Sequence, residues 1–152
     1  MKSIITIILF FSCLVLQAQE KWITVIENKV NSQMLAQLDV NSIRYEDGFL
    51  HFNSKTTYKG LTKKQFILGQ KALNDKHNRK VDLSKFSYTI EKVLYSINNK
   101  RYKETSIIYY DENNNIIDEV INDSMVAKDW FTPAKGSIIE KVINAAIENL
   151  EL

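Results

Sequence analysis

One stretch, residues 87–122, most constrains what this chain of 152 residues can fold into. It reads SYTIEKVLYSINNKRYKETSIIYYDENNNIIDEVIN, in which three runs rich in tyrosine, isoleucine, valine and threonine are joined by two asparagine-rich turns. β-Branched and aromatic side chains suit a pleated, half-buried surface, and asparagine tolerates the positive φ of tight turns. The pattern predicts an antiparallel meander, with strands at 86–97, 100–110 and 115–121.

The residues before this stretch contain further strand signals. A β-rich run, WITVI at 22–26, predicts the first strand, and two more strands fit 40–45 and 49–58. Glu46, Asp47 and Gly48 lie between the last two, where the Asp-Gly pair is typical of a hairpin turn.

Two segments have the periodicity of helices. In 63–74, apolar residues recur loosely at helical spacing, and Thr62 is a candidate cap. Near the end, Ser137 and Glu140 have capping-box spacing and start a strongly amphipathic helix. Its apolar residues are Ile138, Ile139, Val142, Ile143, Ala146, Ile147 and Leu150. We therefore predict an α+β fold, in which an antiparallel β-sheet of about five to six strands has a C-terminal helix packed on one face.

The first 18 residues have the composition of an export signal. Lys2 precedes a mainly apolar run, 4–16, and the small residue Ala18 supplies a cleavage point. The run is shorter than the roughly 20 apolar residues that span a bilayer, which favours a signal peptide over an anchor. We predict a leader at 1–18, a single domain at 19–152, no transmembrane segment in the mature chain, and a secreted, periplasmic or cell-surface location.

Charge is distributed unevenly along the chain. Between Lys55 and Lys85 there are nine basic residues and two acidic ones, whereas 104–129 holds seven acidic residues and one lysine. The basic segment can hold an anionic partner, such as a glycan, a lipid headgroup or an acidic protein, or it can lie against the acidic ends of its own meander. Lys63, Lys64, Arg79 and Lys80 are the candidate binding residues. We predict an anionic surface or another protein as the partner and no nucleic acid, and the oligomeric state stays open.

The usual catalytic and cofactor motifs are missing from the sequence. Cys13 is the only cysteine and lies in the predicted leader, where the bulky residues before it disfavour a lipoprotein signal. His51 and His77 are far apart, no Gly-x-Ser-x-Gly elbow is present, and the four glycines are scattered. We predict no enzyme activity, no metal and no cofactor.

Two further groups of residues can be interpreted either as functional or as structural. The acid pairs at 111–112 and 118–119 could do acid–base chemistry, but their place beside turns favours a solvated role. The tyrosines at 88, 95, 102, 109 and 110 could form a stacking platform, but tyrosine is also a preferred strand residue. The structural interpretation is favoured for both groups.

Several short segments, taken in order, carry a family resemblance. They are Trp22, LDVNSIR at 38–44, YSINNKRY at 95–102, YYDENN at 109–114, and Trp130 with Pro133 before the last helix. Together they resemble the surface-adhesin protein E family of small exported bacterial proteins over nearly the whole mature chain. Members usually have a cysteine near the position of Asn99 and another at the end of the last helix, and this chain has neither.

The resemblance implies an antiparallel sheet with a packed helix, export, and non-catalytic binding. We therefore predict an exported binding or envelope module. One alternative is a small periplasmic ligand carrier or enzyme with a tyrosine-lined pocket on the sheet, and another is an envelope protein that binds its own copy. A closed apolar pocket with convergent polar groups would favour the carrier, whereas a filled core and a projecting basic surface would favour the binding module.

Overall fold

The computed structural model describes residues 20–27, 33–122 and 129–150, so the predicted leader lies outside the described residues. The described part contains six strands and two helices. They are β1 (Trp22–Glu27), β2 (Met34–Glu46), β3 (Phe49–Tyr58), α2 (Gly60–Lys76), β4 (Phe86–Ser96), β5 (Arg101–Asp111), β6 (Ile116–Ile121) and α3 (Ile138–Glu148).

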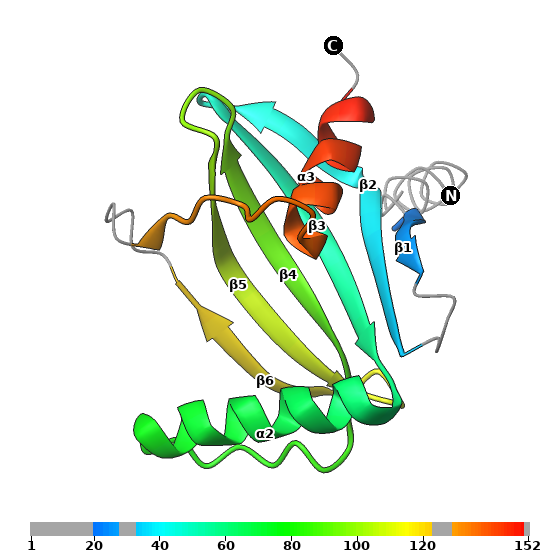
Figure 1. Cartoon of the computed structure of the whole chain (residues 1–152), viewed down its shortest axis with the longest axis vertical. Coiled ribbons are helices and arrows are strands. Elements are labelled where there is room, and N and C mark those ends of the chain that lie inside the picture. Colours follow the sequence, from blue (N-terminus) through cyan, green and yellow to red (C-terminus); the bar gives the residue numbers. More distant parts are fainter. Residues whose placement is uncertain (1–19, 28–32, 123–128, 151–152) are drawn as a thin grey trace, which may run out of the picture.

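The strands form one antiparallel sheet in the order β1-β2-β3-β4-β5-β6, so each strand pairs with its neighbour in sequence (Figure 1). This confirms the predicted meander and the α+β fold. Asp47 and Gly48 have φ of 53° and 85°, and Asn114 has φ of 65°, whereas in the turn between β4 and β5 the residue with positive φ is Lys100, at 51°, and not an asparagine. Asparagine, aspartate and glycine adopt this left-handed region most readily.

Strand β2 is longer than predicted and bends in the middle. Its first half, from Met34, pairs with both β1 and β3, although the sequence predicted a strand only from Val40. The pairing with β3 is interrupted between Asp39 and Arg44. There the Ser42 hydroxyl donates to the Asp39 carbonyl at 2.6 Å and accepts from the Asn53 amide at 2.8 Å. Side-chain hydrogen bonds thus replace the missing ladder bonds at the bend.

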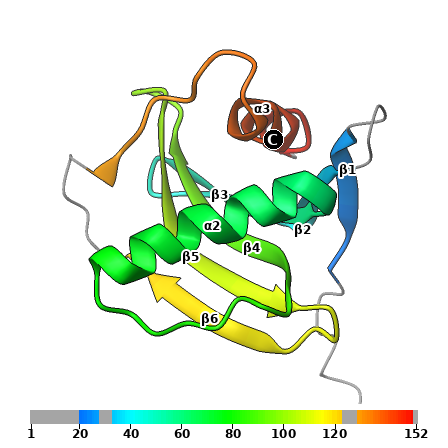
Figure 2. The same cartoon turned by 60° about the horizontal axis from the view of Figure 1, so that its bottom comes forward.

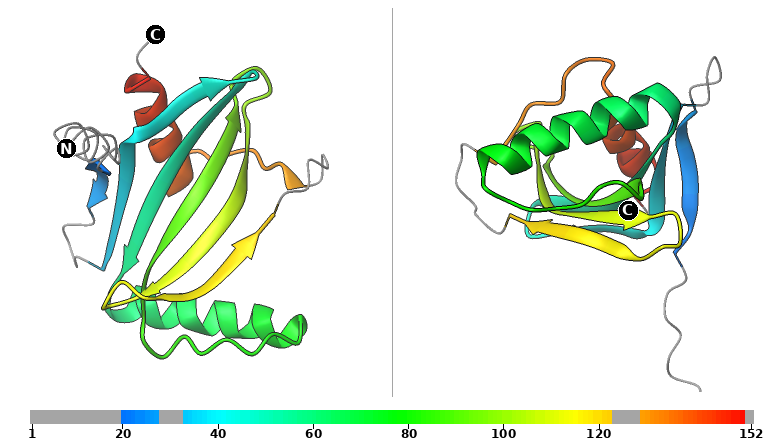
Figure 3. Two further views of the ribbon diagram at one scale, coloured as in Figure 1. Left: turned by 180° about the vertical axis from the view of Figure 1, so that it is seen from behind. Right: turned by 90° about the horizontal axis from the view of Figure 1, so that it is seen from below.

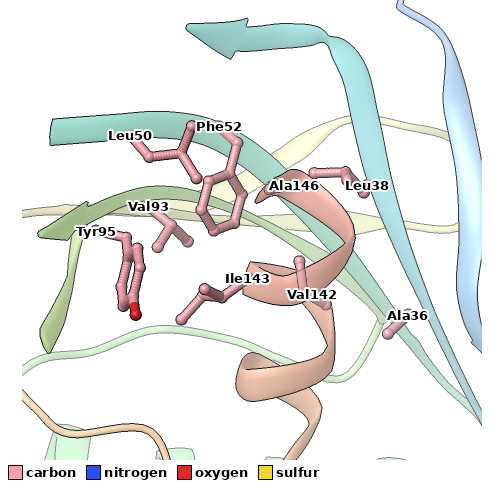
Figure 4. Close-up of a cluster of buried hydrophobic side chains, with 9 residues drawn as sticks. All are labelled: Ala36, Leu38, Leu50, Phe52, Val93, Tyr95, Val142, Ile143 and Ala146. Atoms are coloured by element: carbon pink, nitrogen blue, oxygen red, sulfur yellow. The ribbon is translucent and has the colours of Figure 1, made fainter. Parts of the chain in front are cut away.

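Helix α3 packs on one face of the sheet and completes the main core. Val142, Ile143 and Ala146 are buried, as the apolar stripe predicted, whereas Ile147 is 42% exposed. Figure 4 shows the three buried side chains facing those of the sheet, which are Ala36, Leu38, Leu50, Phe52, Val93 and Tyr95. We name these nine residues the α3 cluster. The predicted packing of the C-terminal helix is confirmed.

The N-terminus of α3 has the predicted cap. The Glu140 amide donates to the Ser137 hydroxyl at 3.2 Å, and the Glu140 carboxylate accepts from the Gly136 amide at 2.5 Å. The glutamate therefore reaches one residue further back than in the standard capping box. The bond to Ser137 satisfies an amide that the first helical turn leaves unpaired, and the bond from Gly136 ties the preceding residue to the helix.

Helix α2 lies across one end of the sheet, on the same side as α3 (Figures 2 and 3). Its Phe66 ring stacks on Phe86 and Tyr58, with ring centroids 4.8 Å and 4.3 Å apart. Phe86 is fully buried, and Tyr109 and Leu83 complete the buried part of this second group. We name Tyr58, Phe66, Leu83, Phe86 and Tyr109 the aromatic cluster.

The sequence analysis was wrong about how α2 begins. Its N-cap is Lys59, and the Thr62 hydroxyl donates to the carbonyls of Gln33 and Lys59 instead of capping the helix. The apolar residues of α2 do not share one buried side, since Leu61 and Leu68 are 58% and 67% exposed. Phe66 turns toward the sheet because the aromatic rings there offer it a larger contact area.

Candidate functional site

A hollow with a mixed polar and apolar lining separates the two apolar clusters on the helix-covered face of the sheet. Its volume is about 340 Å³, and β3, β4 and β5 form its floor while the start of α3 forms its rim. We name it the acidic hollow. It is lined by Ser54, Thr56, Tyr58, Glu91, Tyr102, Glu104, Ser137, Ile138, Ile139 and Val142.

The pairing of β3 with β4 builds the hydrogen-bonded floor of the acidic hollow. Ser54 lies opposite Glu91, and Thr56 lies opposite Thr89. The Ser54 hydroxyl donates to one oxygen of Glu91 at 2.7 Å, and the Thr89 hydroxyl donates to the other. Burial raises the pKa of Glu91, and hydrogen bonds from Thr89, Ser54 and Thr56 oppose this rise.

A β-bulge brings a second carboxyl group into the acidic hollow. Lys92 pairs with Ser106 but Val93 pairs with Glu104, so Thr105 is an extra residue on β5. Because side chains alternate between faces, this extra residue turns Glu104 and Tyr102 toward α3. Burial, and then the nearby Glu91, raise the pKa of Glu104 to about 7. The acidic hollow thus holds two carboxyl groups that resist being charged together.

Neither histidine lines the acidic hollow. His51 lies on β3 between Leu50 and Phe52, which face the core, so its side chain points to the opposite face. His77 is the C-cap residue of α2. Within residues 20–27, 33–122 and 129–150, no group of three or more His, Cys, Asp or Glu side chains is arranged to hold a metal ion. The chemistry that the hollow offers is therefore that of carboxyl and hydroxyl groups.

The acid pairs singled out in the sequence have structural contacts. The Asp111 carboxylate accepts from the amides of Asn113 and Asn115, both at 2.8 Å, and hydrogen bonds led by those from Asn115 lower its pKa. Asp118 forms an ion pair with Arg79, and Glu119 accepts from the Ser106 hydroxyl at 3.0 Å. The carboxylates that share a hollow, Glu91 and Glu104, were missed by the sequence analysis.

The five tyrosines do not form one platform. Tyr95, Tyr102 and Tyr109 belong to the face that carries the helices. Tyr88 and Tyr110 stack on the opposite face with ring centroids 4.8 Å apart, and the Lys55 ammonium lies 4.1 Å from the Tyr88 ring centroid. Among the tyrosines, only Tyr58 and Tyr102 line the acidic hollow. It is therefore less aromatic than the tyrosine-lined pocket of the alternative prediction.

The four candidate binding residues fall into two groups. Arg79 forms an internal ion pair with Asp118 at 2.5 Å, which is the internal use that the charge pattern allowed. Lys63 is half-buried on α2. Lys64 on α2 and Lys80 in the following loop are exposed, so these two are available to a partner. None of the four lines the acidic hollow.

Replacing Glu104 with glutamine is expected to change how stability depends on pH. Because its pKa is raised from 4.5 to about 7, the native protein should lose stability as pH rises from 4.5 to 7 and then level off. Glu104→Gln should therefore gain about 1 to 3 kcal/mol at pH above 7 and little at low pH. Thermal unfolding followed by circular dichroism at a series of pH values measures this. The exposed turn variant Glu112→Gln is the control, and parallel pH curves for the two variants would contradict the prediction.

Comparison with protein-family models, with curated proteins and with solved structures gave no match. Within the described residues, neither α2 nor α3 combines the length and the apolar composition that a membrane-spanning helix requires. The fold and site define a six-stranded antiparallel meander with two helices on one face and a hollow between the sheet and the start of α3 that holds two carboxyl groups.

Proposed function

We propose that the protein is an exported, non-catalytic binding module that contacts an anionic partner through α2 and the loop after it. The observation that carries this proposal is the charge of α2, which has four lysines and one aspartate. The helix lies at one end of the molecule with its outer side uncovered by the sheet (Figure 1). Exposed Lys80 and Lys85 in the following loop extend the positive surface. A partner with negative charge would be attracted to this end.

Export is supported by the leader at 1–18 and by the resemblance to surface-adhesin protein E. A non-catalytic role is supported by the separation of the reactive groups. Both histidines lie away from Glu91 and Glu104, so neither carboxyl group has an imidazole partner for proton transfer.

Neutralising the two exposed lysines of the candidate set should weaken recovery of the anionic partner. Lys64→Gln with Lys80→Gln is the informative variant, because Arg79 is engaged with Asp118 and its loss would disturb the fold. We expect recovery to fall severalfold at low salt, and the wild-type protein to lose binding as salt screens the charges. Pull-down from envelope fractions, followed by mass spectrometry, measures the change.

A control variant with the same change in net charge tests whether the loss of recovery is specific to this surface. Lys135→Gln with Lys141→Gln removes the same charge from exposed positions before and within α3. It should leave recovery unchanged. Equal losses in both double variants, or no loss in either, would contradict a binding surface on α2.

A carrier of a small ligand is the second candidate function, and the acidic hollow favours it. The hollow pairs two carboxyl groups with hydroxyl donors, and a ligand with a protonated amine would relieve the repulsion between Glu91 and Glu104. The test uses the ionisation of Glu104. Above pH 7, butylamine should raise the melting temperature of the wild-type protein and should leave that of Glu104→Gln unchanged. Butanol is the uncharged control, and equal effects of the two compounds would count against a carrier.

A further inference from the structure

The outer side of α2 has an apolar row that the fold does not use. Leu61 and Leu68 are seven residues apart, so they lie along nearly the same line of the helix. They are 58% and 67% exposed. The opposite side carries Phe66, which belongs to the aromatic cluster, and Ile67, which packs against that cluster. Neither leucine packs against the α3 cluster or the aromatic cluster, and apolar side chains aligned on one exposed side of a helix form a candidate contact surface.

Lysines flank this leucine row. Lys64 and Lys71 are also seven residues apart, and they form a second row about 60° away around the helix. Lys76 lies on the other side of the leucines at the C-terminal end. All three lysines are exposed. Leucines bordered by lysines are typical of helices that lie in the interface of a membrane, where lysine stems extend along the apolar surface and the ammonium groups reach the headgroups.

We propose that the outer side of α2 docks flat onto an anionic lipid bilayer, with Leu61 and Leu68 inserted and the lysines bound to headgroup phosphates. This inference rests on the proposed function and specifies the anionic partner. The position of α2 permits it, because the helix spans one end of the molecule and the sheet and α3 lie on its other side (Figures 1 and 3). The loop between α2 and β4 runs alongside the helix at this end, so a planar surface would meet the helix and this loop together (Figures 1 and 3).

Two other occupants explain the surface less well. A soluble polyanion would use the lysines but would leave the leucines exposed to water. A second copy of the chain would cover the leucines, but it would bring four more lysines and only one more aspartate to the same contact. Like charges held close together at an interface oppose association. An anionic bilayer is the occupant that accommodates both rows.

Binding of the mature chain, residues 19–152, to lipid vesicles tests the proposal. Co-sedimentation is compared for vesicles of phosphatidylcholine alone and of phosphatidylcholine mixed with phosphatidylglycerol. We expect binding to the mixed vesicles, with a strong decrease at high salt. Lys64→Gln with Lys71→Gln should weaken it by roughly fivefold per lysine, and Leu61→Gln with Leu68→Gln by about tenfold or more.

The matched control for the leucine variant is Ile116→Gln with Ile121→Gln on β6. These isoleucines are 60% and 61% exposed, so the substitutions remove similar exposed apolar surface elsewhere. They should leave vesicle binding unchanged. Circular dichroism confirms that each variant is folded before it is compared.

The possible results separate the two proposals. If the lysine variant loses vesicle binding and the leucine variant keeps it, the contact is purely electrostatic: insertion is overturned and the proposed anionic partner survives. If both variants bind as well as the wild-type protein, insertion and the basic binding surface both fail. If light scattering shows a dimer that only the leucine variant dissociates, the leucines contact a second copy, and bilayer docking is overturned.

Discussion

Replacement of Ile143 with aspartate is expected to unfold the protein. The side chain is 2% exposed within the α3 cluster, where it faces apolar side chains of the sheet (Figure 4). Burying an unpaired carboxylate costs several kcal/mol, and the packing of the isoleucine is lost as well. A domain of this size has a total stability of about 5 to 15 kcal/mol, so most of it would disappear. Circular dichroism should show no cooperative melting transition at neutral pH.

The next residue supplies the control for this substitution. Asn144 is exposed on the opposite side of α3, so Asn144→Asp introduces the same charge into the same helical turn without burying it. Its melting temperature should stay within a few degrees of the wild-type value. If Ile143→Asp melts at the temperature of this control, α3 is not docked on the sheet.

The meander was predictable because its signals are local. Its strands are rich in β-branched and aromatic residues, and its turns contain asparagine, aspartate or glycine, of which Asp47, Gly48 and Asn114 have positive φ. The helix α3 was predictable for the same reason, since its stripe and its cap are both encoded within a dozen residues. Short turns join β2 to β3, β4 to β5 and β5 to β6, so these strands pair with each other, whereas β3 and β4 pair although α2 and its loop lie between them in the sequence.

The acidic hollow was not predictable, because it depends on a bulge. Simple alternation from Ile107 would turn Thr105 and Lys103 toward the helices, whereas the extra residue at Thr105 turns Glu104 and Tyr102 inward instead. Nothing in the local sequence marks that position, and it is visible only in the pairing of β4 with β5. Glu91 could have been noticed in the sequence, because it shares a strand face with Thr89 and Val93, where an apolar residue is expected.

The exposed side of α2 could not be predicted from the sequence, for a different reason. Periodicity identifies a helix but does not say which of two partly apolar sides faces the core. The aromatic rings of Tyr58 and Phe86 select Phe66, and the leucines then face outward. The proposed membrane contact therefore follows from a packing choice that involves residues distant in the sequence.

Replacement of Phe86 with alanine is expected to cost about 3 to 5 kcal/mol, because a fully buried aromatic side chain is lost from a group of stacked rings. Chemical denaturation measures the loss. Phe131→Ala is the control, since that ring is 56% exposed and should cost about 1 kcal/mol or less. Phe86 also supports Phe66, so amide hydrogen exchange in α2 should become faster than in α3. Equal costs for the two variants, or unchanged exchange in α2, would mean that the aromatic cluster does not hold α2 on the sheet. The helix could not then present a fixed row of leucines to a membrane.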